Sequence, residues 1–256
     1  MSDRHTEITA PQGEIDDRLR RLTRRGFLIG GFAAGGAVGV YEWLTHAQDD
    51  DEAPWPQRRV LDWNGRLAHA YLRDSHLMPT YSLHEVTPLK PNGNIGMEDS
   101  IDAATWRFQF QPGDNMPAFP LSLSDIKSLP KLDLITRLCC IEGWSAIVHW
   151  SGARFSDFVQ KYCPPGRDLP PYVYMATPDE DYYVGLDTKS AMHPQTLLAY
   201  ERNGQPLEEQ HGAPLRLVMP VKYGIKNIKR IGLIRFMNKR PGDYWAEEGY
   251  DWFAGL

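Results

Sequence analysis

The stretch Arg137-Leu138-Cys139-Cys140-Ile141-Glu142-Gly143-Trp144-Ser145 places two adjacent cysteines at the end of a mostly apolar run that begins at Asp133. The run predicts a buried strand that delivers Cys140 to the loop at its end. Side chains alternate along a strand, so only one of the two thiols can face a given site. Three cysteines in 256 residues are too few for a disulfide scaffold or an all-cysteine metal site. One interpretation of the pair is a loop that supplies a metal ligand. The alternatives are two buried structural thiols, a disulfide between the neighbours, or a disulfide from Cys139 to Cys163.

The N-terminal segment has the pattern of a twin-arginine export signal, Thr23-Arg24-Arg25-Gly26-Phe27-Leu28-Ile29, followed by an apolar stretch to Tyr41. Five glycines dilute that stretch, whereas a membrane-spanning helix needs roughly 20 predominantly apolar residues. Residues 1–47 are therefore interpreted as an export signal. An uncleaved membrane anchor is the alternative, because Thr45-His46-Ala47 matches the cleavage pattern poorly. Either interpretation predicts that the rest of the chain lies in the periplasm.

Composition predicts one compact domain after this segment. The formal net charge of −5 disfavours general nucleic-acid binding. Twenty prolines and 22 glycines indicate many turns and short elements. We expect a β-rich α+β fold, with an N-terminal extension over residues 48–100 and the main domain over residues 101–256.

Local patterns predict the individual elements. Residues 105–111 alternate as a half-buried strand does. Ser124 is expected to cap a short helix that ends before Pro130, and apolar residues at 155, 158, 159 and 162 predict an amphipathic helix. Further strands are predicted at 172–176, 215–219 and, as a long last strand, 226–236, with a turn at Asn203-Gly204.

A cluster of basic residues surrounds Gly224. Arg216, Lys222, Lys226 and Lys229 bracket a turn at this glycine, which is typical of a phosphate cradle but also of a solvated strand edge. His193 and His211 are either metal or cofactor ligands or structural histidines. The sequence has no serine-hydrolase order, paired zinc histidines or glycine-rich nucleotide loop.

Four motifs together give a family resemblance: the leader, Cys140-Ile141-Glu142-Gly143-Trp144-Ser145, Ala191-Met192-His193-Pro194, and residues 211–226. The chain from about Trp106 onward resembles the sulfite-oxidase-type molybdopterin enzymes, and within them the catalytic subunits of periplasmic protein-methionine-sulfoxide reductases. The resemblance implies a sulfite-oxidase-type molybdopterin-binding fold and a molybdenum-molybdopterin cofactor.

The resemblance also implies roles for individual residues. Cys140 would be the thiolate ligand of molybdenum, with Cys139 behind it, and Glu142 would tune protons or orient substrate near the metal. The implied cofactor-binding residues are Asn92, Thr177, His211, Arg216 and the segment Gly224-Ile225-Lys226. His211 stands where the methionine-sulfoxide reductases have asparagine.

The function implied is oxygen-atom transfer by an exported enzyme, in the direction of reducing a small-molecule or protein-bound sulfoxide. A membrane haem-containing subunit would supply the electrons, because the chain has no CxxCH haem motif. With no room for a dimerisation domain after the last strand, we expect a monomeric catalytic subunit. Two alternatives stay open: sulfite oxidation, with Arg137, Arg154 and Arg167 as candidate cations, and a non-enzymatic exported binding module.

Overall fold

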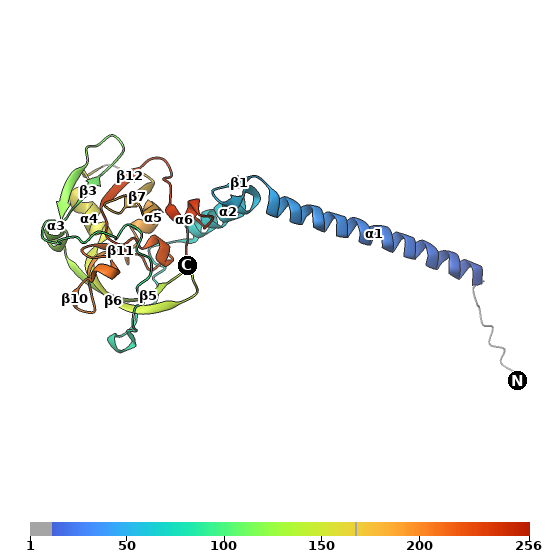
Figure 1. The fold of residues 1–256 in the computed structure, drawn as a ribbon, viewed down its shortest axis with the longest axis horizontal. Helices are drawn as coiled ribbons and strands as arrows, with labels where there is room; N and C mark the ends of the chain where they lie inside the picture. The colour runs from blue at the N-terminus through green and yellow to red at the C-terminus, as the bar shows by residue number, and fades with distance from the viewer. Residues whose placement is uncertain (1–11, 167) are drawn as a thin grey trace. The chain divides into compact units, whose positions relative to one another are not determined.

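The computed structural model describes the backbone of residues 12–166 and 168–256, and the side chains of Arg20 and of residues 26–166 and 168–256. The described residues form two compact units, 12–49 with 54–56 and 50–53 with 57–166 and 168–256. The first contains helix α1 (Gln12–His46), drawn in blue in Figure 1. Its segment Gly26–His46 is long and apolar enough to cross a membrane, and none of that segment is buried. This helix is consistent with a signal or an anchor, and the side chains of the twin arginines lie outside the described residues.

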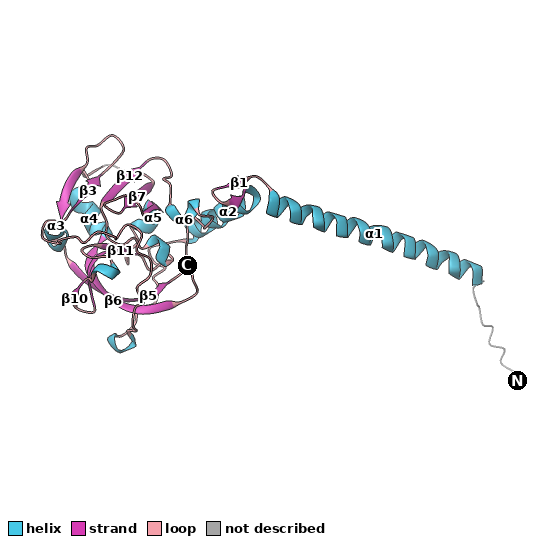
Figure 2. Cartoon of the chain, viewed as in Figure 1, coloured by secondary structure: helices cyan, strands magenta, loops and turns pink. Residues whose placement is uncertain are grey.

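Short strands and short helices make up the rest of the chain (Figure 2). The helices are α2 (Trp55–Tyr71), η1 (Leu83–Glu85), α3 (Leu123–Lys127), α4 (Phe155–Tyr162), α5 (Thr188–Ala191), η2 (Glu209–His211), η3 (Gly224–Lys226) and α6 (Tyr244–Glu247). The strands are β1 (Asp49–Asp50), β2 (Ala53–Pro54), β3 (Arg107–Gln111), β4 (Phe119–Ser122), β5 (Lys131–Cys139), β6 (Ser145–Arg154), β7 (Tyr172–Ala176), β8 (Tyr183–Asp187), β9 (Leu197–Arg202), β10 (Gln205–Pro206), β11 (Arg216–Val218) and β12 (Leu233–Met237). The predicted β-rich α+β class is confirmed.

Two five-stranded sheets form the second unit. One has the order β10-β9-β6-β5, with β11 also pairing β9, and the other has the order β4-β3-β12-β7-β8. Strand β12 runs parallel to β3 and antiparallel to β7. The main core contains side chains from both sheets and from α4, and the rings of Phe110 and Phe158 lie 4.8 Å apart within it. The burial of these aromatic side chains is the main driving force for the packing of the two sheets.

Most of the predicted elements are present. Strand β3 lies within the predicted range, α4 ends before Pro164, β7 matches its predicted range, and Asn203 and Gly204 turn with φ values of +52° and +74°. Each of these patterns depends on near neighbours in the chain.

Three local predictions are wrong. Helix α3 is capped by Ser122 and not by Ser124. The Ser122 hydroxyl accepts from the Asp125 N–H, and the Asp125 carboxylate accepts from the Ser122 N–H, so the two residues form a capping box at the start of the helix. Strand β5 is only half-buried, since its residues alternate between core and solvent. The predicted last strand is broken: residues 224–226 form η3 and only Leu233–Met237 are extended. Arg230, with φ +50°, lies in the irregular segment between them.

Candidate active site

Cys140 lies in the tight turn that joins β5 to β6. The two strands pair from Lys131 opposite Ala153 to Cys139 opposite Ser145. Beyond that pair the Cys140 N–H donates to the Trp144 carbonyl at 2.8 Å, and the Gly143 N–H donates to the Cys140 carbonyl at 3.1 Å. Gly143 has φ +87°, which a residue with a Cβ adopts only with strain. The hairpin therefore holds the Cys140 thiol at its end, half-buried, and all three cysteines of the chain are free.

Asn92 and Glu142 lie beside this thiol. The Asn92 side-chain amide donates to Cys140 Sγ at 3.7 Å. Glu142 accepts a hydrogen bond of 2.9 Å from the Trp144 indole N–H. That bond, followed by one from Asn92, lowers the pKa of the Glu142 carboxyl below its ordinary value. Glu142 is therefore ionised at neutral pH, and it lies next to the Cys140 thiol that Asn92 contacts.

Arg216 is a buried cation close to this group. Its guanidinium donates to the carbonyls of His211 at 2.9 Å and Asn227 at 3.1 Å, and lies 4.7 Å from the centre of the Trp150 ring. Burial lowers the pKa of Arg216 to about 10, so the group stays charged at neutral pH. No carboxylate of the described residues forms an ion pair with it. A buried charge without a counter-ion is costly unless a ligand supplies one.

Lys229 is a second cation at this place, and it is half-buried. Its ammonium donates to the carbonyls of Asn92 at 2.5 Å, Gly93 at 2.9 Å and Gln210 at 3.1 Å. Burial, and then the charge of Arg216, lower the pKa of Lys229 to about 8. Across the described residues Lys229 has no carboxylate partner either. By bonding the Asn92 and Gly93 carbonyls, Lys229 fixes the loop that presents the Asn92 amide to Cys140.

A cavity of about 180 Å³ connects these groups. Its wall is formed by Leu89, Lys90, Asn92, Gly93, Ile95, Leu138, Cys140, Ile141, Glu142, Trp144, Tyr182, His211, Arg216, Gly224, Ile225, Asn227, Lys229, Trp245 and Tyr250. The structure thus brings together seven residues that the sequence singled out: Asn92, Cys140, Glu142, His211, Arg216, Gly224 and Ile225. Burial lowers the pKa of His211 to about 4, so its imidazole is neutral. The arrangement suits a ligand that offers an anionic group to two cations and a soft metal to the thiolate.

Thr177 does not line this cavity. Its hydroxyl donates to the Asp179 carboxylate at 2.5 Å and accepts from the Tyr182 N–H at 3.1 Å, which closes the turn after β7. Gly96 packs on the same side chain: a Cβ at Gly96 would lie 2.4 Å from Thr177 Oγ1. Thr177 therefore supports the loop that carries Asn92, and its direct contact with a cofactor stays a prediction.

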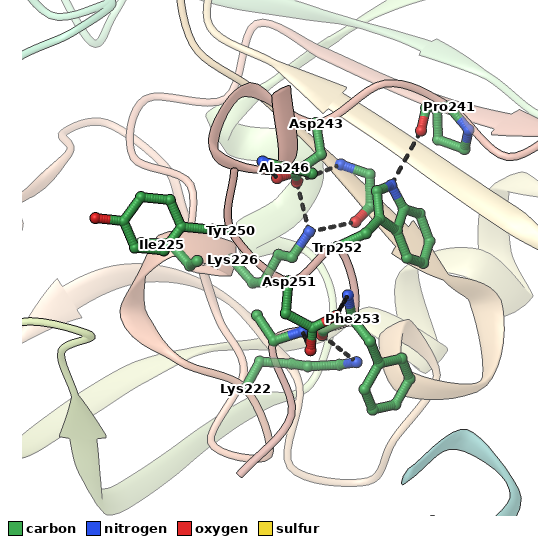
Figure 3. Close-up of polar contacts among 12 residues, drawn as sticks. Lys222, Ile225, Lys226, Pro241, Asp243, Ala246, Tyr250, Asp251, Trp252 and Phe253 are labelled. Carbon is green, nitrogen blue, oxygen red and sulfur yellow. Dashed lines mark hydrogen bonds and ion pairs between the residues drawn. The ribbon is translucent and has the colours of Figure 1, made fainter. Parts of the chain in front are cut away.

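Lys226 does not line the cavity either. Its fully buried ammonium donates to the Asp243 carboxylate at 2.5 Å and to the Gly185 carbonyl at 3.0 Å, and lies 5.0 Å from the centre of the Trp252 ring. Figure 3 shows this side chain enclosed between Asp243 and Trp252, whereas Ile225 and Tyr250 lie on the other side. The predicted contact of Lys226 with a cofactor stays a prediction, and its backbone partner is the Tyr223 carbonyl.

Lys222 forms a second buried pair next to Lys226. Its ammonium lies 3.3 Å from Asp187 Oδ2 and donates to the Phe253 carbonyl at 2.8 Å, beside the Phe253 ring in Figure 3. Burial lowers the pKa of Lys222 to about 7, and the Asp187 charge opposes that shift. Two of the four basic residues that bracket Gly224 are thus paired with aspartates inside the domain, and the other two face the cavity.

Sequence reasoning missed the aromatic part of the wall, which Tyr182, Trp245 and Tyr250 contribute. It named Lys229 only as a neighbouring base and did not choose Asn227 at all. The segment repeats an Ile-Lys pair, at 225–226 and 228–229. Because of this repeat, either Lys226 or Lys229 could have been the lysine that faces the cavity. His193 is buried away from the cavity, where its Nδ1 accepts from the Gln195 N–H at 3.3 Å, as a structural histidine does.

Comparisons with known proteins identify the family. The family model described as an oxidoreductase molybdopterin binding domain matches residues 94–245. A putative protein-methionine-sulfoxide reductase subunit of Azospira oryzae is 35% identical over 248 residues, which cover 94% of this chain and 91% of that protein.

Two curated proteins named protein-methionine-sulfoxide reductase catalytic subunit are also similar. The Burkholderia mallei protein is 34% identical over 277 residues, covering 96% of this chain and 80% of that protein. The Xanthomonas campestris protein is 39% identical over 140 residues, covering 50% of this chain and 44% of that protein.

Proposed function

The chain belongs to the family of oxidoreductases with a molybdopterin-binding domain, and from that premise we propose that it reduces a neutral sulfoxide, with Cys140 as the thiolate ligand of the molybdenum. It is a molybdopterin-dependent oxidoreductase, and molybdenum-molybdopterin is its cofactor. When bound, this cofactor supplies the metal centre at which an oxygen atom and two electrons are exchanged.

The residues around the cavity fit this cofactor. Arg216 and Lys229 are cations without carboxylate partners among the described residues, which suits the phosphate of the pterin. The Cys140 thiolate is a soft ligand, as a metal already held by sulfur donors prefers. We therefore assign the lysine contact to Lys229 and keep Lys226 as a structural residue. Asn92, His211, Gly224 and Ile225 complete the proposed cofactor wall.

Asn92 and Glu142 would act on protons and on the thiolate. The Asn92 amide donates to Cys140 Sγ, which stabilises the negative charge on sulfur. Glu142 is ionised and borders the cavity, so it can accept a proton from solvent and deliver it at the cavity wall. The Trp144 indole N–H holds its carboxylate in place.

The ionised Glu142 is the observation that favours a sulfoxide over sulfite. With Arg216 and Lys229 assigned to the cofactor phosphate, the Glu142 carboxylate beside Cys140 repels a sulfite anion, and Lys90 on the cavity wall opposes that repulsion in part. A neutral sulfoxide carries no charge to repel. The side chains of Leu89, Ile95 and Ile141 add apolar surface, which suits a thioether.

Two of the arginines named as candidate cations for sulfite do not line the cavity. Arg137 is exposed and lies 5.4 Å from the Tyr81 ring centre, and Arg154 is exposed at the end of β6. Arg167 lies outside the described residues.

The relatives named protein-methionine-sulfoxide reductase support the same choice and suggest methionine sulfoxide in proteins as the substrate. We further propose that the chain is exported to the periplasm through its twin-arginine segment and acts as a monomeric catalytic subunit. Electrons would come from a membrane haem-containing subunit.

Steady-state kinetics with the purified, molybdenum-loaded full chain tests the substrate. We expect turnover of a methionine-sulfoxide peptide with a reduced dye as electron donor, and no oxidation of sulfite by an oxidised dye. The variant Glu142→Gln should lose part of the discrimination against sulfite, because the repelling charge is gone. An enzyme that oxidises sulfite and leaves the sulfoxide unchanged would overturn the proposal.

A further inference from the structure

Helix α2 has two different faces. Its inner face carries Arg58 and Gly65, both buried, and a Cβ on Gly65 would meet the Phe253 side chain at 3.0 Å. Its outer face carries Val60, Trp63, Leu67 and Tyr71, with exposed fractions of 57, 59, 50 and 74%. Their spacing of three, four and four residues places these four side chains on one side of the helix. We call this group the outer stripe.

The outer stripe differs from the other exposed apolar residues of the described part of the domain. Ile95, Ile141 and Tyr250 are exposed, but they line the cavity. Leu77, Leu83 and Leu256 are also exposed, but they do not lie on α2. Large apolar side chains that are exposed as a contiguous group mark a surface that another molecule covers.

Arginines border the outer stripe. Arg59 and Arg66, two helical turns apart, line a hollow of about 360 Å³ together with Val60, Asp62 and Trp63. Asp62 is paired with Arg240 at 2.8 Å, and among the residues that the structure describes neither Arg59 nor Arg66 forms an ion pair. Tryptophan and tyrosine beside free arginines are typical of helices that lie in a membrane interface, where the ring meets the acyl boundary and the cation meets phosphate.

Retention of the N-terminal helix in a bilayer would keep α2 near the membrane surface. The segment Gly26–His46 is long and apolar enough to cross a bilayer. Residues 47–54 follow it, and an extended stretch of that length reaches at most about 28 Å. If the N-terminal helix is retained in the bilayer, α2 begins within that distance of the end of the helix, and a weak affinity then suffices to hold it at the surface.

We propose that α2 is an interfacial helix whose outer stripe inserts into the headgroup region of a lipid bilayer. This inference rests on the proposed export and on retention of the N-terminal helix. The acid run Asp49-Asp50-Asp51-Glu52 precedes α2 and opposes binding to anionic lipids. Burial of apolar surface therefore drives the contact, and the two arginines bond phosphates that zwitterionic lipids also carry.

The inner face connects this contact to the active site. Arg58 donates to the carbonyls of Ala246 at 2.7 Å and Tyr250 at 2.8 Å. Tyr250 lines the cavity, and α6 with the residues after it forms that part of the wall. An α2 held in the interface thus fixes the direction in which the cavity opens relative to the membrane.

Site-specific photo-cross-linking tests the proposal on the full chain. The photoreactive residue p-benzoylphenylalanine replaces Leu67 in one protein, Tyr71 in a second, and Leu83 in a matched control that is 65% exposed. Each protein is irradiated in native membranes and in reconstituted phosphatidylcholine vesicles, and adducts are identified by mass spectrometry. We expect lipid adducts at positions 67 and 71 in both preparations, several-fold above the control at 83.

Two results would overturn the proposal. An adduct with a polypeptide at position 67 in native membranes would assign the outer stripe to a protein partner. Adduct yields at 67 and 71 no higher than at 83 would remove the contact altogether. Sulfoxide reduction with a dye donor is measured on the same samples: its absence from the unmodified protein would contradict the proposed function and leave the cross-linking result to decide the inference.

Discussion

The four basic residues around Gly224 divide into two pairs that differ in their partners. Lys222 and Lys226 point into the domain, and each is paired with a buried aspartate. Arg216 and Lys229 line the cavity and bond only carbonyl oxygens. A buried cation with its own carboxylate is complete without a ligand, whereas one that bonds neutral dipoles keeps a charge that an anion can still satisfy. The first pair therefore stabilises the fold, and we propose that the second binds the cofactor.

The largest expected effect concerns the thiol on the cavity side. Cys140→Ser should reduce sulfoxide turnover by roughly 10³-fold or more, as loss of a group central to the reaction does. Cys139→Ser is the matched control and should keep most of the activity, because Cys139 ends strand β5 and does not line the cavity. Turnover and molybdenum content are measured for both variants. An inactive Cys139→Ser with an active Cys140→Ser would move the metal ligand by one residue.

The next effect concerns the paired cations. Asp243→Asn removes the counter-ion of the fully buried Lys226 and should lower the free energy of unfolding by about 3–5 kcal/mol. Asp62→Asn breaks the partly exposed pair with Arg240 and should cost less than about 1 kcal/mol. Urea unfolding of the cofactor-free proteins measures both. Similar, small losses in the two variants would mean that the buried pair does not stabilise the fold.

Exchanging the two lysines for methionine compares the pairs directly. Lys229→Met should leave the unfolding free energy of the cofactor-free protein within about 1–2 kcal/mol of the original, because its partners are carbonyls near solvent. Its molybdenum content should fall by about tenfold, because one charged contact with the cofactor is lost. Lys226→Met should destabilise the protein strongly, since Asp243 is left buried and unpaired. If molybdenum is instead lost in Lys226→Met and kept in Lys229→Met, the lysine contact with the cofactor belongs to Lys226, as the sequence predicted.

The smallest effect is a pH dependence of anion binding. Lys229 has a pKa of about 8 without a ligand, and a bound anion raises the pKa. Well below pH 8 Lys229 is charged with and without the anion, so the affinity does not depend on pH. The affinity falls as the pH rises from 8 toward the pKa of the complex, by at most about tenfold per pH unit. Inorganic phosphate binding to the cofactor-free protein between pH 7 and 9 measures this. Lys229→Arg keeps its charge and should flatten the profile; an equally steep profile in that variant would assign the dependence to another group.

Part of the site could be predicted from the sequence because its signals are local. The position of Cys140 at a strand end follows from the apolar run and from Gly143. Arg216 and His211 lie close together in a motif of a few residues. The choice between Lys226 and Lys229 is different: both follow an isoleucine, and the irregular segment between η3 and β12 decides which one reaches the cavity.

The sequence alone determined the strand-rich class, the apolar N-terminal helix, the family resemblance and the thiol at the hairpin end, because period, composition and short motifs record interactions between near neighbours. Only the tertiary structure decided which basic residues have buried aspartates and which do not. Lys226 pairs with Asp243 across 17 positions and Lys229 holds the Asn92 carbonyl across 137. Burial and counter-ions are set by such distant contacts, and they determine whether a charge stabilises the fold or binds a ligand.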